Sequence, residues 1–372
     1  MKKERMLVKV NQPLLKGNEK KNLLSCLKDN SISSTGKFVI EFEKKFAKYL
    51  NRKFAIAVSS GTAALQLAVE SLNLKKGDEI ILPAFTIISC ILPLIRLGIK
   101  PILVDSDLRT WNMNVDEIEP KISKKTKAIM VPHIYGLPVE MSKIIRIAKK
   151  HNLKIIEDSA EVLGLTYNKK KCGSFGDVSI FSFYANKHIT TGEGGMVVTN
   201  DKKIAESCKS QRNLCFNTKR RFSHNRLGWN FRITNLQAAL GVAQLEKISY
   251  FIKKKRFIGK FYSKNLQNLK NITLPLKKTK YAENIYWVYG ILAKNISHQK
   301  KITNQLFRRG IETRPFFWPL NKQPILKKMG FFKKVKMPIA EDLARRGFYI
   351  PSGLSLSIKE QKYVIKNLKK VL

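Results

Sequence analysis

One lysine stands in a setting that favours covalent chemistry. Lys187 follows an apolar run at 178–183, typical of a β-strand, and precedes a bend that contains Gly192, Gly194 and Gly195. A lysine held between a buried strand and a tight bend lies close to the core, where desolvation lowers the pKa of its amine. A neutral amine attacks carbonyl compounds, so the pattern suggests Schiff-base chemistry. The alternative is that Lys187 is one more surface lysine in a lysine-rich chain.

A second segment has the composition of an anion site. Residues 59–65 join an apolar strand to the start of a helix and consist mostly of small side chains. The free N–H groups near Ser60, Gly61 and Thr62 and the positive end of the helix dipole would favour a phosphate group. The same residues would also make an ordinary helix N-cap, which is the commoner use of such a segment.

An acidic residue ends a third apolar strand. Asp158 follows the run at 153–157, where parallel sheets bind their ligands, although capping of the next turn is the commoner role. Taken in chain order, the phosphate site, the aspartate and the lysine match the needs of pyridoxal 5′-phosphate (PLP). The aspartate would keep the ring nitrogen protonated and the lysine would carry the cofactor. Each feature is weak alone, and the ordered set predicts the cofactor.

The elements that must position these residues alternate along the chain. Amphipathic spacing predicts helices at 18–29 and 41–50 before the first strand. Strands separated by helices then predict an α/β protein whose mostly parallel sheet is covered on both faces. The predicted strands are 54–58, 80–82, 101–104, 128–131, 153–157, 178–183 and 196–199, and the predicted helices begin at Thr62 and cover 87–97 and 141–151.

The C-terminal third predicts a second lobe. A long helix is expected over 234–250, continuing to about residue 269, followed by strands at 271–275 and 286–292. These patterns divide the chain into an N-terminal arm with a large PLP-binding domain (1–250) and a small α+β domain (251–372).

The amino-acid composition limits the classes of partner that we expect the protein to bind. The net charge is +44, from 71 Lys+Arg against 27 Asp+Glu, but the lysines are scattered and no helix-turn-helix, zinc-finger or RNA-binding signature accompanies them. We therefore read the charge as a compositional bias and do not expect nucleic-acid binding. The 5 cysteines form no Cys-x-x-Cys pair, which argues for a reducing compartment and against a zinc site or a disulfide framework.

Targeting features are not evident in the sequence. The basic start is not followed by an apolar run, and the most apolar stretch, 80–97, is broken by Pro83 and Pro93 and carries Arg96. We expect a cytoplasmic protein with no membrane insertion.

The chain resembles the sugar aminotransferases of the DegT/DnrJ/StrS group, PLP enzymes with the aspartate-aminotransferase fold. The resemblance runs from about residue 12 to the C-terminus and implies that Lys187 is the Schiff-base lysine and Asp158 the partner of the ring nitrogen. It rests on residues 60–65, 157–161, 182–187, 191–195 and 228–232.

The resemblance also implies how the phosphate is held. Gly61, Thr62 and Ser182, with Ser60 beside them, would hold the phosphate of the same subunit's cofactor. Asn230 would reach the phosphate of the neighbouring subunit's cofactor, and a shared site of this kind implies an obligate homodimer.

Two positions depart from the family pattern. Many relatives carry an aromatic residue against the cofactor ring where this chain has Ile87, so either this aliphatic side chain or Phe85 would cover the ring. Many relatives also have His or Gln at the position of Glu161, beside the phenolic oxygen of the ring. A glutamate there would repel a phenolate unless it is protonated or balanced, so its pKa should be coupled to the site.

The resemblance extends to the substrate. The loop at 311–320 borders the sugar-nucleotide site in the family, which implies contacts from Arg314 and Phe316, whereas Asn321 stands where a histidine is often found. Residues 184–187, 221–224 and 314–317 most resemble the perosamine-synthase branch. The implied reaction takes an amino group from a donor, most often glutamate, to GDP-4-keto-6-deoxymannose, with a UDP- or dTDP-linked keto sugar as the alternative.

Other functions stay open on the sequence alone. A PLP-dependent sugar dehydratase of the same fold would replace the lysine with histidine, and His188 is the next residue. A nucleic-acid-binding regulator is suggested only by the charge of +44. A carrier that binds PLP without turnover is the third alternative.

Overall fold

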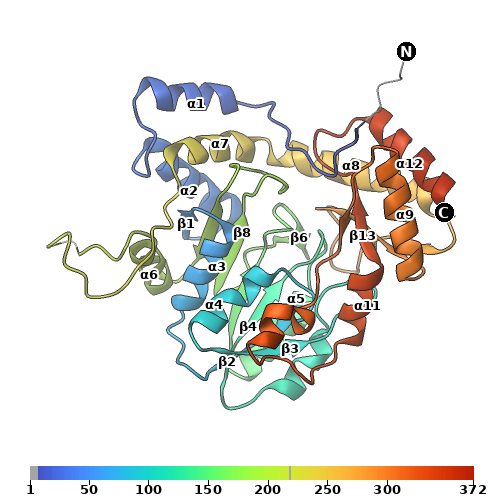
Figure 1. Cartoon of the computed structure of the whole chain (residues 1–372). Coiled ribbons are helices and arrows are strands. Elements are labelled where there is room, and N and C mark those ends of the chain that lie inside the picture. Colours follow the sequence, from blue (N-terminus) through green and yellow to red (C-terminus); the bar gives the residue numbers. More distant parts are fainter. Residues whose placement is uncertain (1–6, 218) are drawn as a thin grey trace.

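The computed structural model describes residues 7–217 and 219–372, and its centre is a seven-stranded sheet ordered β1–β9–β8–β5–β4–β2–β3 (Figure 1). β9 runs antiparallel to both of its neighbours and the other adjacent pairs are parallel, so the predicted α/β class with a mostly parallel sheet is confirmed. The strands are β1 (Phe54–Val58), β2 (Glu79–Pro83), β3 (Lys100–Val104), β4 (Thr126–Pro132), β5 (Lys154–Asp158), β8 (Val178–Ser182) and β9 (Gly195–Thr199).

The sheet is apolar on both faces because helices cover both. In β4, Met130 faces the core that contains α3, whereas Ile129 and Val131 face the core that contains α5. Over β1, β8 and β9 the second face is covered by α2 and α7. The covering helices are α2 (Lys37–Leu50), α3 (Gly61–Glu70), α5 (Met141–Lys150), α6 (Lys202–Arg212) and α7 (Asn235–Glu246).

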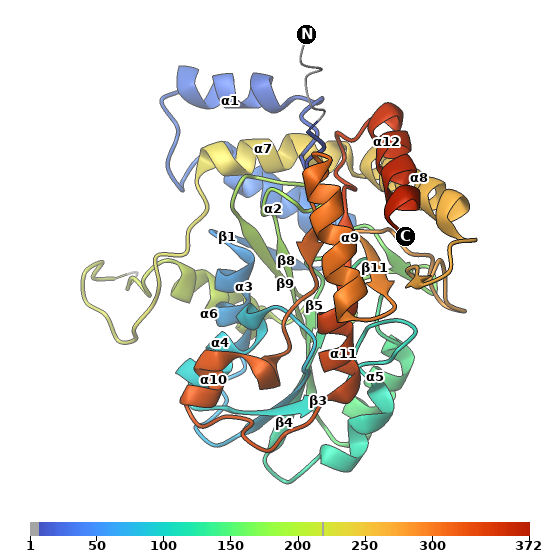
Figure 2. The ribbon, with the colours of Figure 1, turned by 45° about the vertical axis from the view of Figure 1, so that its right-hand side comes forward.

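The N-terminal arm lies across the large sheet's helices. α1 (Glu19–Lys28) contacts α7 and lies over it at the top of Figure 2. α2 begins a turn earlier than the predicted 41–50, because the side chain of Asn235 accepts a hydrogen bond from the N–H of Phe38 at 2.9 Å. That cap comes from a residue almost two hundred positions away, so local spacing could not reveal it.

Shorter elements connect the strands. The helix predicted at 87–97 is split into a 3-10 turn and a short helix, since Pro93 stands in the first turn of the latter, where proline is favoured. These elements are η1 (Ile88–Cys90), α4 (Leu92–Arg96), η2 (Val115–Glu117), η3 (Glu119–Lys121) and the hairpin strands β6 (Thr166–Tyr167) and β7 (Lys170–Lys171).

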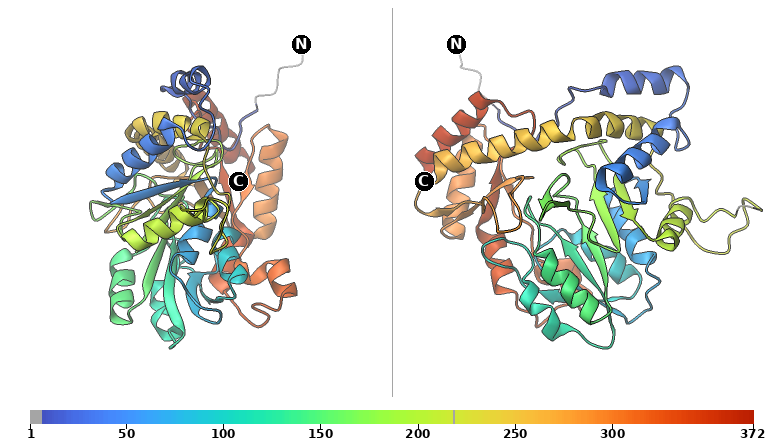
Figure 3. Two further views of the ribbon diagram at one scale, coloured as in Figure 1. Left: turned by 90° about the vertical axis from the view of Figure 1, so that its left-hand side faces the viewer. Right: turned by 180° about the vertical axis from the view of Figure 1, so that it is seen from behind.

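The long helix predicted over 234–269 is two helices. α7 ends at Glu246 and α8 (Ile248–Leu266) begins after Lys247, and the two run end to end from the large sheet to the C-terminal lobe (Figure 3). The apolar spacing continues through the junction. Ile248 and Phe251 at the start of α8 still pack into the core that α7 covers, whereas Ile258 and Tyr262 farther along α8 pack into the core of the C-terminal lobe.

The C-terminal lobe is built on an antiparallel sheet of four strands ordered β10–β11–β13–β12. Leu326 and Leu343, from α10 and α11, nevertheless pack into the core of the large sheet. The domain division near residue 250 remains a prediction. The elements are β10 (Ile272–Thr273), β11 (Tyr289–Ala293), β12 (Arg314–Pro315), β13 (Gly347–Ile350), α9 (Ile296–Arg308), η4 (Leu320–Lys322), α10 (Pro324–Lys328), α11 (Pro338–Arg346) and α12 (Ile358–Val371).

Within residues 7–217 and 219–372, no helix combines enough length with enough apolar character to span a membrane.

Candidate active site

A cavity of about 400 Å³ opens at the carboxyl ends of the parallel strands, between the large sheet and the C-terminal lobe. Parallel sheets bind ligands at this edge because the loops that follow the strands converge there. Its lining contains most of the predicted site residues, namely Ser60, Gly61, Thr62, Asp158, Glu161, Ser182 and Lys187. The chemistry inferred from separate segments therefore converges in one cavity.

One end of the cavity has the features of an anion site. Ser60 caps α3 by accepting the N–H of Ala63 at 3.1 Å, and the first N–H groups of α3 have no acceptor within the helix. A Cβ on Gly61 would stand 2.8 Å from the Cβ of Ser182, so only glycine lets the helix start approach that serine so closely. The hydroxyls of Thr62 and Ser89 lie 3.0 Å apart.

Lys187 projects into the same cavity from the loop after β8. Its Nζ lies 3.7 Å from the centre of the Trp287 ring and 3.7 Å from Oε1 of Glu161. Burial lowers the pKa of the Lys187 amine, against the opposing effect of the charges of Glu161 and Asp158. A larger share of this amine is thus neutral, and nucleophilic, than for a surface lysine.

Asp158 is the last residue of β5. Its Oδ1 accepts the N–H of Ala160 at 3.0 Å and its Oδ2 lies 3.5 Å from the Sγ of Cys90. Burial raises the pKa of Asp158, while the Ala160 N–H, the charge of Lys187 and the Cys90 thiol lower it. A buried carboxylate with few donors favours a cationic partner, which is what a protonated ring nitrogen supplies.

Glu161 is the second acid of the cavity. Its Oε2 accepts the N–H of Tyr135 at 2.8 Å, and its side chain is almost fully buried. Burial, with a smaller contribution from the charge of Asp158, raises the pKa of Glu161 to about 7, against the lowering effects of Lys187 and the Tyr135 N–H. This acid therefore exchanges its proton near neutral pH.

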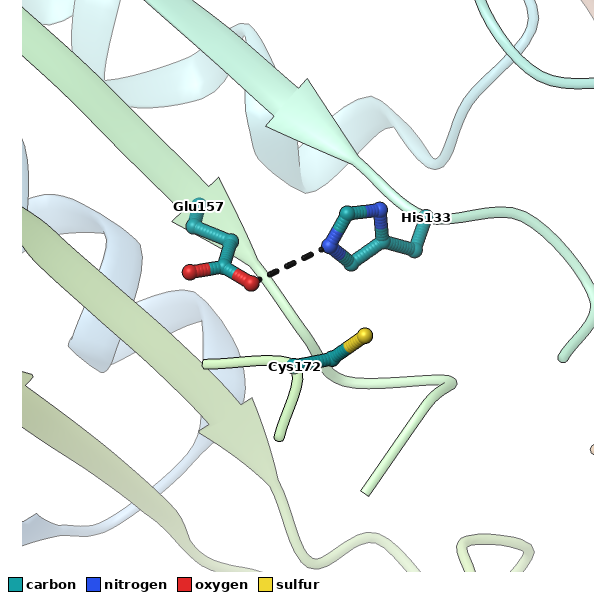
Figure 4. Close-up of side chains that lie close together, drawn as sticks. All are labelled: His133, Glu157 and Cys172. Atoms are coloured by element: carbon teal, nitrogen blue, oxygen red, sulfur yellow. Dashed lines mark hydrogen bonds and ion pairs between the residues drawn. The ribbon is translucent and has the colours of Figure 1, made fainter. Parts of the chain in front are cut away.

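Behind the cavity wall lies a buried cluster of His133, Glu157 and Cys172, whose ligand atoms lie within 4.8 Å of one another (Figure 4). Nδ1 of His133 accepts the N–H of Val139 at 3.1 Å, which leaves Nε2 to donate to Glu157 at 3.2 Å.

The carboxylate of this cluster is already surrounded by donors. Burial raises the pKa of Glu157, but hydrogen bonds from His133 and from backbone N–H groups outweigh it and hold the pKa at about 2. The cluster is therefore a brace that fixes His133, a residue of the cavity lining, rather than a set of free ligands.

Other predicted residues lie away from the cavity lining. Phe85 is fully buried and packs against Tyr135 at 5.9 Å, whereas Ile87 lines the cavity. Phe316 is buried beside Phe85, and Asn321 donates to Glu341 at 2.9 Å.

Two further predicted residues are exposed. Arg314 lies on β12 opposite Tyr349, which does line the cavity. Asn230 lies on the connection between α6 and α7, and does not line the cavity of its own chain.

Several residues of the cavity were not singled out by the sequence. Trp287 and Tyr349 come from the C-terminal lobe, where strand periodicity does not show which side chains face the other lobe. The remaining ones that we did not assign are Leu65, Thr86, Ser89, Pro132, His133, Ile134, Ala160, Ile180, Tyr184, Asn186, Glu193 and Phe317. Leu65, Ala160, Tyr184, Asn186, Glu193 and Phe317 lie in segments that carry the family resemblance, but we assigned them no role.

The donor set fits PLP. The helix start with the Ser182 hydroxyl matches a phosphate, Asp158 matches a protonated ring nitrogen, and the Lys187 amine matches the aldehyde. Glycine at position 61 leaves open the space that the phosphate cup requires.

Comparison with known proteins agrees with this chemistry. The model of the DegT/DnrJ/EryC1/StrS aminotransferase family matches residues 13–369. The chain belongs to this family. It is therefore a PLP-dependent aminotransferase, and the cofactor predicted from the sequence is confirmed.

Relatives and solved structures cover nearly the whole chain. The GDP-perosamine synthase of Escherichia coli O157:H7 is 43% identical over 97% of both chains, and that of Vibrio cholerae is 37% identical over 97% of this chain and 99% of its own. The structure of Helicobacter pylori PseC, an aminotransferase involved in the biosynthesis of pseudoaminic acid, superposes with a TM-score of 0.93 at 27% identity, over 98% of this chain and 99% of that one.

Proposed function

We propose that this aminotransferase converts GDP-4-keto-6-deoxymannose to GDP-perosamine, with glutamate as the amino donor. The observation that carries the proposal is the identity of 43% with a GDP-perosamine synthase over 97% of each chain. The cavity supports it, since Lys187, Asp158 and the phosphate cup lie together at its wall.

Different residues of the cavity would have different roles in the reaction. Lys187 would attach the cofactor through Nζ and, once released, would act as the base that carries a proton between the amino carbon of the substrate and the cofactor. When bound, PLP supplies an electron sink for that carbon. Asp158 would hold a proton on the ring nitrogen, and its burial strengthens that interaction.

Glu161 would hold a proton beside Lys187. Because the pKa of Glu161 is about 7, this acid can take up or release a proton near neutral pH. Its Oε1 lies 3.7 Å from Nζ, close enough to exchange a proton after a small approach or through one water.

We propose that the active unit is a homodimer whose sites are completed across the interface by Asn230. Residues 219–231 belong to a connection that extends away from the body of the chain (Figure 1). On it Leu227 is 96% and Phe222 80% exposed, and Trp229 stacks on Phe231 at 5.1 Å. Exposed aromatic and aliphatic side chains on an extended segment are typical of surfaces that become buried in an assembly.

The dehydratase alternative receives less support from the cavity. Lys187 lines it, whereas the neighbouring His188 is fully buried and is not part of the lining.

We also propose that the protein works in the reducing cytoplasm, because its cysteines are free thiols.

The test is a direct comparison of acceptors. Purified protein with PLP and glutamate would be given GDP-4-keto-6-deoxymannose, or a UDP- or dTDP-linked 4-keto-6-deoxy sugar, and the products identified by mass spectrometry. We expect the GDP sugar to give the amino sugar together with one equivalent of 2-oxoglutarate. Faster turnover of a UDP or dTDP sugar would reject the GDP assignment, and loss of the sugar hydroxyl without a gain of nitrogen would identify a dehydratase.

A further inference from the structure

A second lysine is buried outside the cavity. Lys255, on α8, is 3% exposed, and no carboxylate of the described residues lies within ion-pair distance of it. Every other lysine in the described ranges is more exposed than this one. Burial of an amine without an acidic partner is costly, and an apolar side chain at this position would avoid that cost. We therefore expect the amine of Lys255 to have a specific role at this position.

The amine of Lys255 joins separate parts of the C-terminal lobe. Nζ donates to the carbonyl oxygen of Trp287 at 2.8 Å and to that of Ser352 at 2.5 Å. Trp287 precedes β11 and Ser352 follows β13, and the Ser352 hydroxyl accepts the N–H of Tyr289 at 3.2 Å. One side chain thus fixes α8 against the segments at the ends of both central strands.

One of these segments forms the wall over the catalytic lysine. The Trp287 ring centre lies 3.7 Å from the Nζ of Lys187, and the indole Nε1 donates to the carbonyl of Asn186 at 3.0 Å. Continuous contacts therefore lead from Lys255 through the backbone and ring of Trp287 to the Lys187 amine and to the residue before it.

We propose that Lys255 is a positioning residue for Lys187, which acts by holding Trp287 against the catalytic amine. The two donated hydrogen bonds do not depend on the charge of Lys255, since a neutral amine and an ammonium can each donate two hydrogens. This agrees with the burial of Lys255, which lowers its pKa to about 7.

The positive charges of both amines act on His188. Burial first, and then the charges of Lys255 and Lys187, hold the pKa of His188 well below its usual range. His188 is thus held as a neutral imidazole, and Lys255 keeps its two hydrogen bonds whether or not its amine is charged.

The test measures the amine of Lys187 directly and does not depend on the identity of the sugar. Full-length protein freed of cofactor is treated with formaldehyde and cyanoborohydride over a range of pH, and methylation of Lys187 is followed by peptide mass spectrometry. Lys255→Met has a similar length but no donor. In this variant the carbonyl of Trp287 loses its hydrogen-bond donor, and the wall over Lys187 loosens. Water then reaches Lys187, and the burial that lowers the pKa of the Lys187 amine weakens.

We expect the pH midpoint of Lys187 labelling to rise in Lys255→Met by about half a unit, which makes labelling at pH 7.5 about threefold slower. Lys253→Met, an exposed neighbour on the same helix, is the matched control and should leave the midpoint unchanged. In the double variant with Trp287→Phe, which keeps a ring but loses the Nε1 donor, the shift should be no larger than that of the stronger single variant, since both act through one contact.

A lower melting temperature of Lys255→Met with an unchanged pH midpoint for Lys187 would show a purely structural role and overturn the proposal. Additive shifts of the midpoint in the double variant would show that Lys255 does not act through Trp287. If Lys255→Met does not fold, Lys255→Gln retains an N–H2 group on a shorter stem. It should shift the midpoint less but in the same direction, and no shift in that variant would equally reject the role.

Discussion

Replacement of Glu161 with glutamine tests the electrostatics of the cavity. The substitution keeps the size of the side chain and an oxygen for the Tyr135 N–H, but removes the proton exchange. In the folded protein burial raises the pKa of Glu161 from 4.5 to about 7. Folded protein therefore binds more protons than unfolded protein between these pH values, and the stability of wild type falls as pH rises through this window.

The size of the effect follows from the same values. A rise of about 2.5 pKa units corresponds to at most about 3 kcal/mol of stability, present below pH 4.5 and lost by about pH 7. Glu161→Gln lacks this contribution, so its stability relative to wild type should increase from pH 5 to pH 8. Loss of the Glu161 charge also lowers the pKa of Lys187 further, which adds to the increase in the same direction.

The assay is urea unfolding of cofactor-free protein at pH 5, 6, 7 and 8, at one protein concentration. A constant offset between variant and wild type reports the lost contact with Lys187, and only the change of that offset with pH tests the argument. Glu206→Gln, on the exposed surface of α6, controls for the same substitution without burial. Parallel pH dependences for Glu161→Gln and wild type would refute a raised pKa at Glu161.

Further variants test the separate parts of the site. Asp158→Asn should keep PLP bound but slow turnover about 10- to 100-fold, as expected for loss of one charged hydrogen-bond partner; steady-state rates within twofold of wild type would exclude its role. Ser182→Ala should weaken PLP affinity about tenfold, measured by fluorescence titration, with no change in kcat at saturating PLP. Mixed dimers of Asn230→Ala and Lys187→Ala subunits should recover activity above that of either homodimer, because both defects fall in one site; no recovery after demonstrated exchange would remove the contact across the interface.

The sequence predicted the large sheet closely because its strands are buried on both faces. The predicted strand at 54–58 coincides with β1, and the other predicted strands of the large sheet differ from the observed ones by one or two residues at their ends, whereas β11 begins three residues after the predicted start at 286. Runs of apolar residues identify such strands without help from the rest of the chain. Boundaries that depend on distant contacts, such as the start of α2 at its Asn235 cap, could not be found in this way.

The candidate site was predictable where it depends on strand ends, and not where it depends on side-chain direction. Asp158 ends β5 and Lys187 follows β8, its parallel neighbour in the sheet, so their approach is a consequence of topology. Phe85 and Ile87 belong to one loop, yet only Ile87 lines the cavity, since local spacing does not fix side-chain direction outside regular elements. Trp287 meets Lys187 only because the C-terminal lobe folds back onto the sheet.

The charges of the cavity explain how a glutamate is accommodated beside the catalytic lysine. Burial disfavours two ionised carboxylates beside a single ammonium, so one acid must keep its proton near neutral pH. Both pKa values are raised, but Asp158 has the Ala160 N–H and the Cys90 thiol beside it, whereas Glu161 titrates only at about 7. Glu161, whose Oε1 lies 3.7 Å from the Lys187 Nζ, then changes its charge near neutral pH, so its effect on the catalytic amine depends on pH.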